Sequence, residues 1–327
     1  MTENLDLKDK KLIFALSQDA RLPHSQLAKQ LGLSKNAVTY RIERLQREHL
    51  IEKFIAVINI GALKLDTFCL LLKFNEDIYG NPDILSYIEN HSFINWAVVL
   101  SGDWDFFVEF VYTEQRDIVN IVTELIQLFG NRLNAYHTYF SYNPIKVEPL
   151  VRAFSKEFIK EYLPRKKRTR EKYDVDAIDK KILHLLATDS ALSYVEITKK
   201  LSLSLDVVRY RMKRLEERGI IIYYTPHIPL RALGYTEYLC TIKLENITKN
   251  KLATLHQYFE QHDHITYAFF DQISLMMIFT IAFRTAQEID TFSRDLRKNY
   301  IGSIAEQKYT IIRQELVYTL FPKGLLE

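Results

Sequence analysis

The chain has few of the residues and motifs that would mark a reactive centre. Its 327 residues include only two cysteines, nine glycines and eight prolines. Cys69 and Cys240 lie in apolar, strand-like segments at non-equivalent positions, which favours buried thiols over a disulfide or a metal pair. The sequence contains no glycine-rich phosphate loop, nucleophile elbow or cysteine cluster. We therefore expect a protein that is not an enzyme and holds no cofactor or metal.

Long apolar segments are also missing. No apolar run approaches the roughly 18 residues of a membrane span, and the start MTENLDLKDK lacks the basic and apolar regions of a signal peptide. A hydrophobic content of 47% with little glycine and proline is typical of compact domains rich in regular structure. The net charge of +3 is small, so any basic surface is local. We expect a soluble, cytoplasmic protein of a reducing compartment with no membrane partner.

What the chain does contain is a repeat. Residues 9–51 align without a gap with residues 179–221. The identical positions include Asp9/Asp179, Leu33/Leu203, Ser34/Ser204, Tyr40/Tyr210, Arg41/Arg211 and Arg44/Arg214. A period this long corresponds to a whole folding unit, because solenoid repeats span only about 20 to 50 residues.

Each copy of the repeat predicts a helix-turn-helix. In the first copy the turn at residues 31–34 ends in Ser34, which can cap the next helix. That helix carries Val38, Ile42 and Leu45 on one face and polar or basic residues on the other, as a major-groove reader requires. An ordinary three-helix unit with a solvated charged face is the alternative. Retention of the Ser, Tyr and both Arg positions in the two copies favours the helix-turn-helix.

After the helices, each copy changes to strand-like periodicity. The expected order is strand, helix, strand, strand, helix, strand, which is the ferredoxin-like arrangement. In the first copy these elements are expected at 66–74, 81–90, 93–100, 104–112, 114–129 and 134–142; in the second copy they are expected at 236–245, 248–261, 265–270, 275–283, 285–299 and 306–318. Phe106, Val108 and Phe110 alternate with Phe107 and Glu109, so both sheet faces carry apolar residues. This pattern predicts that the two ferredoxin-like domains of the chain pair through their sheets.

The predicted fold class is α+β, with two repeats that each contain a winged helix-turn-helix domain followed by a ferredoxin-like βαββαβ domain. The expected boundaries are 1–54 and 55–143 for the first repeat, 144–173 for a basic linker with a short helix at 154–162, and 174–224 and 225–327 for the second repeat. Five of the six linker residues 165–170 are cationic, which suits a solvated hinge that also attracts phosphates.

The chain resembles the Lrp/AsnC (feast/famine) transcriptional regulators. The resemblance covers most of the chain and is stronger in the helix-turn-helix than in the ferredoxin-like domain. Its residues are Leu33, Ser34, Val38, Arg41, Ile42, Leu45 and Ile51, with Leu203, Ser204, Val208, Arg211, Met212, Leu215, Gly219 and Ile221 in the second copy. The resemblance implies double-stranded DNA as the partner, pairing through the sheet domains with further homo-oligomers, and an amino acid or related metabolite as effector.

The residues expected to contact DNA lie at the exposed side of the two recognition helices. They are Ser34, Lys35, Asn36, Thr39, Tyr40, Arg41 and Arg44, with Ser204, Asp206, Arg209, Tyr210, Lys213 and Arg214. Asn36, Thr39, Asp206 and Arg209 are candidates for base edges, and the cations and tyrosines for the backbone. Arg41 and Arg211 have an alternative role, pairing with Asp9 or Asp179.

The resemblance places an effector near the turn between the two middle strands of the ferredoxin-like domain. In the first copy this turn holds Gly102, Asp103 and Asp105, whose carboxylates could receive an amino group. An ordinary tight turn explains Gly102 equally well. The second copy reads DQISLM there and lacks the glycine, which makes the first copy the expected sensor.

Two rival functions remain open. Sirohaem decarboxylases are similar in pairing two such units, and place His and Arg or Tyr around a tetrapyrrole close to the strand turn. Neither turn segment of this chain, GDWDFF or DQISLMM, contains His or Arg. The other rival is a ligand-sensing or scaffolding protein that has lost DNA binding, suggested by Asp206 in the second recognition helix.

The outward residues of the two recognition helices differ between the copies. If the chain does bind DNA, we therefore expect an asymmetric DNA site.

Overall fold

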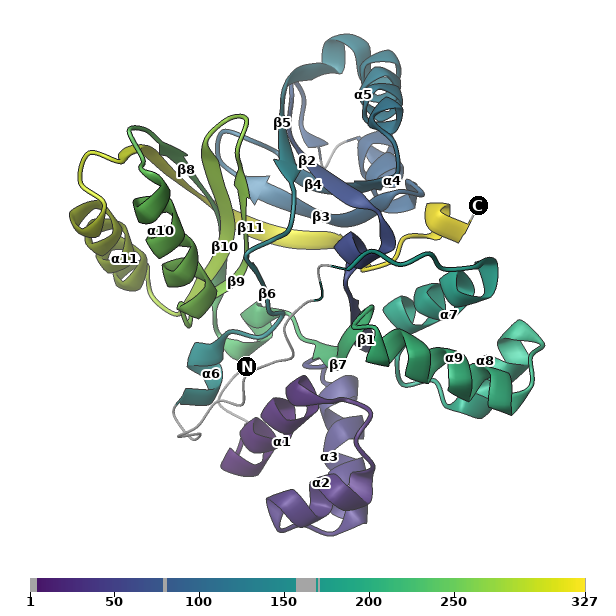
Figure 1. Ribbon diagram of the computed structural model, residues 1–327. Helices are drawn as coiled ribbons and strands as arrows, with labels where there is room; N and C mark the ends of the chain where they lie inside the picture. The colour runs from purple at the N-terminus through teal and green to yellow at the C-terminus, as the bar shows by residue number, and fades with distance from the viewer. Residues whose placement is uncertain (1–4, 79–80, 157–168, 170, 327) are drawn as a thin grey trace. The chain divides into compact units, whose positions relative to one another are not determined.

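The computed structural model describes residues 5–78, 81–156, 169 and 171–326 (Figure 1). Contacts divide the chain into two compact units. The helical unit contains residues 1–64, 149–234 and 325–327, and the sheet unit contains residues 65–148 and 235–324. Each repeat therefore contributes its helix-turn-helix to one unit and its ferredoxin-like domain to the other.

The helical unit contains the same succession of elements from each repeat. The first repeat supplies α1 (Leu7–Gln18), α2 (His24–Leu31), α3 (Lys35–Arg47), β1 (Lys53–Ile58) and η2 (Ile60–Leu63). The second supplies α7 (Ala177–Thr188), α8 (Tyr194–Leu201), α9 (Leu205–Glu217), β7 (Ile221–His227) and η5 (Leu230–Leu233). A capping box formed by Ser193 and Glu196 begins α8, whereas α2 begins after Pro23 with no side-chain cap.

Strands β1 and β7 join the two helix-turn-helix copies. They pair in antiparallel fashion, with Lys53 opposite His227 and Val57 opposite Tyr223. The loop after the first helix of each repeat binds the strand of the other: the Ala20 N–H donates to the Tyr224 carbonyl at 3.0 Å, and the Ser190 N–H to the Phe54 carbonyl at 2.8 Å. The strand that follows each helix-turn-helix thus finds its partner in the other repeat.

The sheet unit contains two ferredoxin-like domains. The first has β2 (Asp66–Phe74), α4 (Pro82–Asn90), β3 (Ile94–Ser101), β4 (Phe106–Tyr112), α5 (Gln115–Phe129), η4 (Gly130–Arg132), β5 (Leu133–Ser141) and β6 (Lys146–Val147). The second has β8 (Thr236–Leu244), α10 (Lys249–Gln261), β9 (Ile265–Asp271), β10 (Met276–Phe283), α11 (Ala286–Asn299) and β11 (Ile304–Tyr318). This confirms the predicted fold of two repeats.

The strands in the described part of the sheet unit form one nine-stranded sheet in the order β5-β2-β4-β3-β11-β8-β10-β9-β6. The long strand β11 pairs with β8 through Ile311 and then continues along β3 of the other repeat. In the same way β5 pairs with β2, and the chain then continues into β6, which pairs with β9. The consecutive strands β5 and β6 therefore lie at opposite ends of the strand order.

Both faces of this sheet are buried, as the alternation predicted. Phe106 and Phe110 pack with the helix residue Leu125 in the core of the first domain. Phe107 points the other way and packs against Leu239 and Phe269 of the second domain. The strands are therefore apolar on both sides because helices cover one face and the other repeat covers the second.

The linker is described only in part. Helix α6 covers Arg152–Lys156, so the predicted helix at 154–162 extends beyond the described residues. Of the predicted basic cluster at 165–170, only Thr169 is described; its carbonyl accepts a hydrogen bond from the Asn59 side-chain amide at 3.0 Å. No helix in the described part of the chain is long and apolar enough to cross a membrane.

A buried polar group lies where the two ferredoxin-like domains meet. The carboxyl group of Glu109, only 5% exposed, accepts hydrogen bonds from the Asn95 amide at 2.6 Å and the Tyr267 hydroxyl at 2.6 Å. Burial, followed by the proximity of Glu109, raises the pKa of Tyr267 well above its ordinary value. The phenol therefore stays protonated and continues to donate across the domain boundary.

We predict that Tyr267→Phe lowers the free energy of unfolding by about 2 kcal/mol, because a buried acceptor loses one of its donors. Chemical denaturation followed by circular dichroism measures the change. Tyr136→Phe is the matched control, since Tyr136 is 42% exposed whereas Tyr267 lies inside the sheet unit. An equal loss in the two variants would contradict the structural role of the Tyr267 hydroxyl.

Candidate nucleic-acid interface

The two recognition helices, α3 and α9, begin at equivalent serines. The Ser34 hydroxyl accepts from the Ala37 N–H at 3.1 Å, and the Ser204 hydroxyl accepts from the Val207 N–H at 3.3 Å. Each satisfies an amide that the first turn of a helix leaves without a partner. The preceding turns reach left-handed backbone at Gly32 (φ 61°) and Ser202 (φ 55°). These local features fix where each recognition helix starts.

One face of each recognition helix is buried in its own repeat. Val38, Ile42 and Leu45 anchor α3. Val208, Met212 and Leu215 occupy the equivalent positions in α9. The opposite face of each helix is left to solvent, as the sequence pattern predicted.

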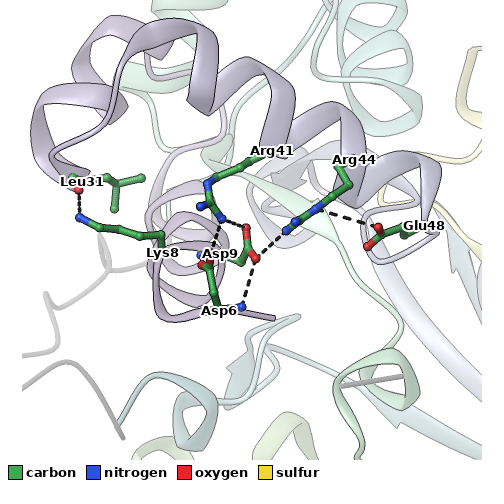
Figure 2. A network of polar contacts seen from close by, with 7 residues as sticks. All are labelled: Asp6, Lys8, Asp9, Leu31, Arg41, Arg44 and Glu48. Atoms are coloured by element: carbon green, nitrogen blue, oxygen red, sulfur yellow. Dashed lines mark hydrogen bonds and ion pairs between the residues drawn. The ribbon is translucent and has the colours of Figure 1, made fainter. Parts of the chain in front are cut away.

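The two arginines of α3 that recur in the second repeat do not point outward. Figure 2 shows Arg41 and Arg44 directed toward Asp9 of α1, whose side chain is fully buried. Arg41 lies 2.5 Å from one Asp9 oxygen and Arg44 lies 2.5 Å from the other. Arg41 also contacts Asp6 at 2.8 Å. The pairing of Arg41 with Asp9, which the sequence left as an alternative, is present.

The second repeat contains the same arrangement. Arg211 contacts Asp176 at 2.7 Å and Asp179 at 2.9 Å, and Arg214 contacts Asp179 at 2.5 Å. The hydrogen bond from Arg211 lowers the pKa of Asp176 below its ordinary value. The contribution of this pair to stability is therefore present above the pKa of an unfolded Asp, about 4, and is lost as the pH falls through the folded value.

These ion pairs divide the residues expected to contact DNA into two groups. Arg41, Arg44, Arg211 and Arg214 hold each recognition helix to the first helix of its repeat. The other residues face outward: Ser34, Lys35, Asn36, Tyr40, Ser204, Asp206, Arg209, Tyr210 and Lys213 are exposed, and Thr39 is half-buried. Tyr40 and Tyr210 are 59% and 65% exposed, so both rings are accessible from solvent.

The residues expected to bind an effector lie at the turn between β3 and β4. Gly102 has φ 149°, in the region that favours glycine, and both Gly102 and Asp103 are exposed. The Asp105 carboxylate accepts from the Phe74 N–H at 2.7 Å and so closes the end of β2. In the second copy Asp271 is buried and accepts from the Ile273 N–H and the Ser274 hydroxyl. Both aspartates therefore have structural partners.

Arg21 is a residue that the sequence did not single out. Its guanidinium donates to the carbonyls of Ser190 and Leu192 at 2.8 and 3.0 Å and lies over the rings of Tyr194 and Tyr224. It thus links the two helix-turn-helix copies. Its equivalent in the second copy is Ala191, so the repeat itself gave no signal. Its partners become visible only once β1 and β7 are paired.

The fold and this surface define a protein with two winged helix-turn-helix domains, each followed by a ferredoxin-like domain. A family model described as winged helix-turn-helix DNA-binding matches residues 5–52 and 175–222. The chain is 32% identical over 130 residues to the HTH-type transcriptional regulator LrpA of Pyrococcus horikoshii, covering 40% of this chain and 88% of that protein. It is 24% identical over 142 residues to the regulatory protein AsnC of Haemophilus influenzae, covering 43% and 95%. The chain belongs to the Lrp/AsnC family.

A solved structure shares the two-repeat fold. The siroheme decarboxylase NirDL superposes with a TM-score of 0.62 at 11% identity, covering 95% of this chain and 93% of that one. The likeness extends over both repeats, whereas the relatives LrpA and AsnC each match less than half of this chain. At this identity the likeness concerns the fold alone.

We predict that Asp9→Asn destabilises the first helix-turn-helix by about 3 kcal/mol, because it leaves two half-buried guanidinium groups without their shared carboxylate. Asp179→Asn should act in the same way in the second copy. Denaturant titration of each variant, followed by helical circular dichroism, tests this.

The control for this prediction is Asp6→Asn. Its side chain is 52% exposed, Asn also caps helices well, and the loss should stay below about 1 kcal/mol. If Asp6→Asn were as damaging as Asp9→Asn, the buried carboxylate would not be the anchor of the recognition helix.

Proposed function

We propose that the chain is a cytoplasmic, sequence-specific DNA-binding transcriptional regulator whose two fused repeats present two recognition helices in place of the two subunits of a dimer. The observation that carries the proposal is the pairing of β1 with β7, which holds both helix-turn-helix copies in one unit while their polar faces stay exposed. Membership of the Lrp/AsnC family supports it. A helix with a buried apolar stripe and an exposed polar face is suited to the major groove.

An amino acid or related small metabolite is the proposed effector. The support is the exposed turn at Gly102 and Asp103, where a ligand could approach the backbone without meeting a Cβ atom. The first repeat is the proposed sensor. In the corresponding turn of the second repeat, the residue with left-handed backbone is Leu275, whose side chain a ligand approaching the backbone would meet. We also infer that whole chains associate further through the sheet unit.

The DNA-binding proposal predicts retardation of promoter-containing DNA in a mobility-shift assay, with an affinity that falls as salt rises. Lys35→Gln and Lys213→Gln should each weaken binding to all sequences and reduce the salt slope by about one, because each removes one phosphate contact. Both lysines are exposed on recognition helices.

Lys249→Gln serves as the control, because Lys249 is exposed on α10 in the sheet unit. It should leave both affinity and salt slope unchanged. Failure of the unmodified chain to retard any DNA at low salt would overturn the proposal and favour a ligand-sensing or scaffolding protein.

The second candidate is a sirohaem decarboxylase. Besides the likeness to NirDL, the fold places basic residues beside the β3–β4 turn that are distant from it in sequence. The His137 ring lies 5.4 Å from the Trp104 ring, and Arg313 donates to the Ser101 hydroxyl at 3.0 Å. The sequence comparison of the turn segments alone missed both residues.

Titration of the purified chain with sirohaem tests this candidate. Tetrapyrrole binding at the turn should shift the absorption band of sirohaem, and His137→Ala should abolish the shift, whereas His184→Ala in the helical unit should leave it unchanged. An unshifted spectrum with the unmodified chain would remove the decarboxylase from consideration.

A further inference from the structure

The two recognition helices carry different residues where their first turns face outward. Asn36 and Thr39 of α3 correspond to Asp206 and Arg209 of α9. Positions three apart on a helix lie on one face, so each pair forms one small patch. In helix-turn-helix proteins the first residues of the recognition helix contact base edges. The difference therefore falls where a base would be read.

In α3 the outward patch is uncharged, and the hydroxyl of Thr39 is already engaged. The Thr39 hydroxyl donates to the Lys35 carbonyl at 3.1 Å and lies 2.8 Å from Nδ1 of His24. This leaves its methyl group, together with the exposed amide of Asn36, to meet the groove. An Asn amide pairs with the N6 and N7 groups of adenine, and a methyl group packs on the methyl of thymine.

In α9 the equivalent outward patch, formed by Asp206 and Arg209, is charged. Tyr194 stands where His24 stands in the first repeat, and the Arg209 guanidinium lies 5.9 Å from the centre of its ring. Arg21 lies over the same ring at 5.1 Å, which fixes Tyr194 in place. An Arg supported on a ring can present two of its N–H donors to O6 and N7 of guanine, and a carboxylate such as Asp206 accepts from N4 of cytosine.

The arginines that the two recognition helices share do not contribute to the difference in base preference. Arg41, Arg44 and their equivalents Arg211 and Arg214 are held by buried aspartates in both repeats. Base discrimination therefore falls to residues that differ between the repeats. Those in or beside the first turn of each recognition helix are at positions 24, 36 and 39 in the first repeat and 194, 206 and 209 in the second.

We propose that α3 reads a half-site with A·T pairs under its first turn, and that α9 reads a half-site with G·C pairs at the equivalent positions. The natural target is then an asymmetric duplex with an A·T half-site and a G·C half-site. This inference rests on the proposed DNA-binding function and specifies the DNA that the function requires.

The test is selection of bound fragments from random duplex DNA with the full-length chain and two variants. The first variant, H24Y/N36D/T39R, gives α3 the reading residues of α9. The second, D206N/R209T, gives α9 those of α3 and keeps Tyr194, because Tyr194 also contacts Arg21. Thermal unfolding of each variant confirms that it is folded before selection.

The unmodified chain should select unlike half-sites. The first variant should select two G·C half-sites and the second two A·T half-sites, each binding its matched duplex at least about tenfold more tightly than the natural one. Glu43→Lys is the control, since it introduces the residue of the second repeat one turn later in α3. It should raise affinity for all sequences and leave the base preference as it was.

Two results would overturn the inference while leaving DNA binding intact. One is a natural target with identical half-sites, and the other is a set of variants that select the same DNA as the unmodified chain. Absence of any selected DNA with the unmodified chain would instead overturn the proposed function itself, and this inference with it.

Discussion

The structure depends on strand edges that each repeat leaves open and the other repeat closes. In the helical unit β1 finds its partner in β7, and in the sheet unit β11 continues onto β3 while β6 continues onto β9. An isolated repeat would expose rows of backbone N–H and C=O groups along these edges, which invites aggregation. Fusing two repeats supplies the missing strands at fixed stoichiometry. The repeats are therefore halves of one fold and not independent domains on a string.

Much of this fold could be predicted from the sequence, because local patterns specify local structure. The alternation of Phe106 and Phe110 with Phe107 predicted a sheet buried on both faces, and the core has that arrangement. What could not be predicted is which strand pairs with which across the repeats. The residues of β1 favour an extended strand, but nothing in that segment identifies β7 as the strand with which it pairs. Arg21 was missed for the same reason, since its partners Ser190 and Leu192 lie in the other repeat.

The sequence predicted which face of each recognition helix is exposed, but it did not predict which of the cations on that helix are paired inside the protein. A count of cations along a recognition helix cannot separate a phosphate contact from an internal ion pair, because the two require the same residue type. Arg44 and Asp9 are 35 residues apart and meet only after α1 and α3 have packed. With two arginines of each helix neutralised in this way, the exposed charge that remains near the first turn of α3 is that of Lys35. Non-specific phosphate attraction is correspondingly smaller, and more of the discrimination falls to base edges.

Fusion of the two repeats also allows the sequences of the two recognition helices to diverge independently. In a homodimer one sequence encodes both helices, so any substitution alters both half-sites and the target stays palindromic. Here the residues that hold the helices, such as Asp9 and Asp179, are the same in both repeats, while the outward residues Thr39 and Arg209 differ. Stability constrains the first set, because an unpaired buried charge costs several kcal/mol. The second set makes no such contribution to the fold, so the two helices could diverge in what they read without either repeat losing its structure.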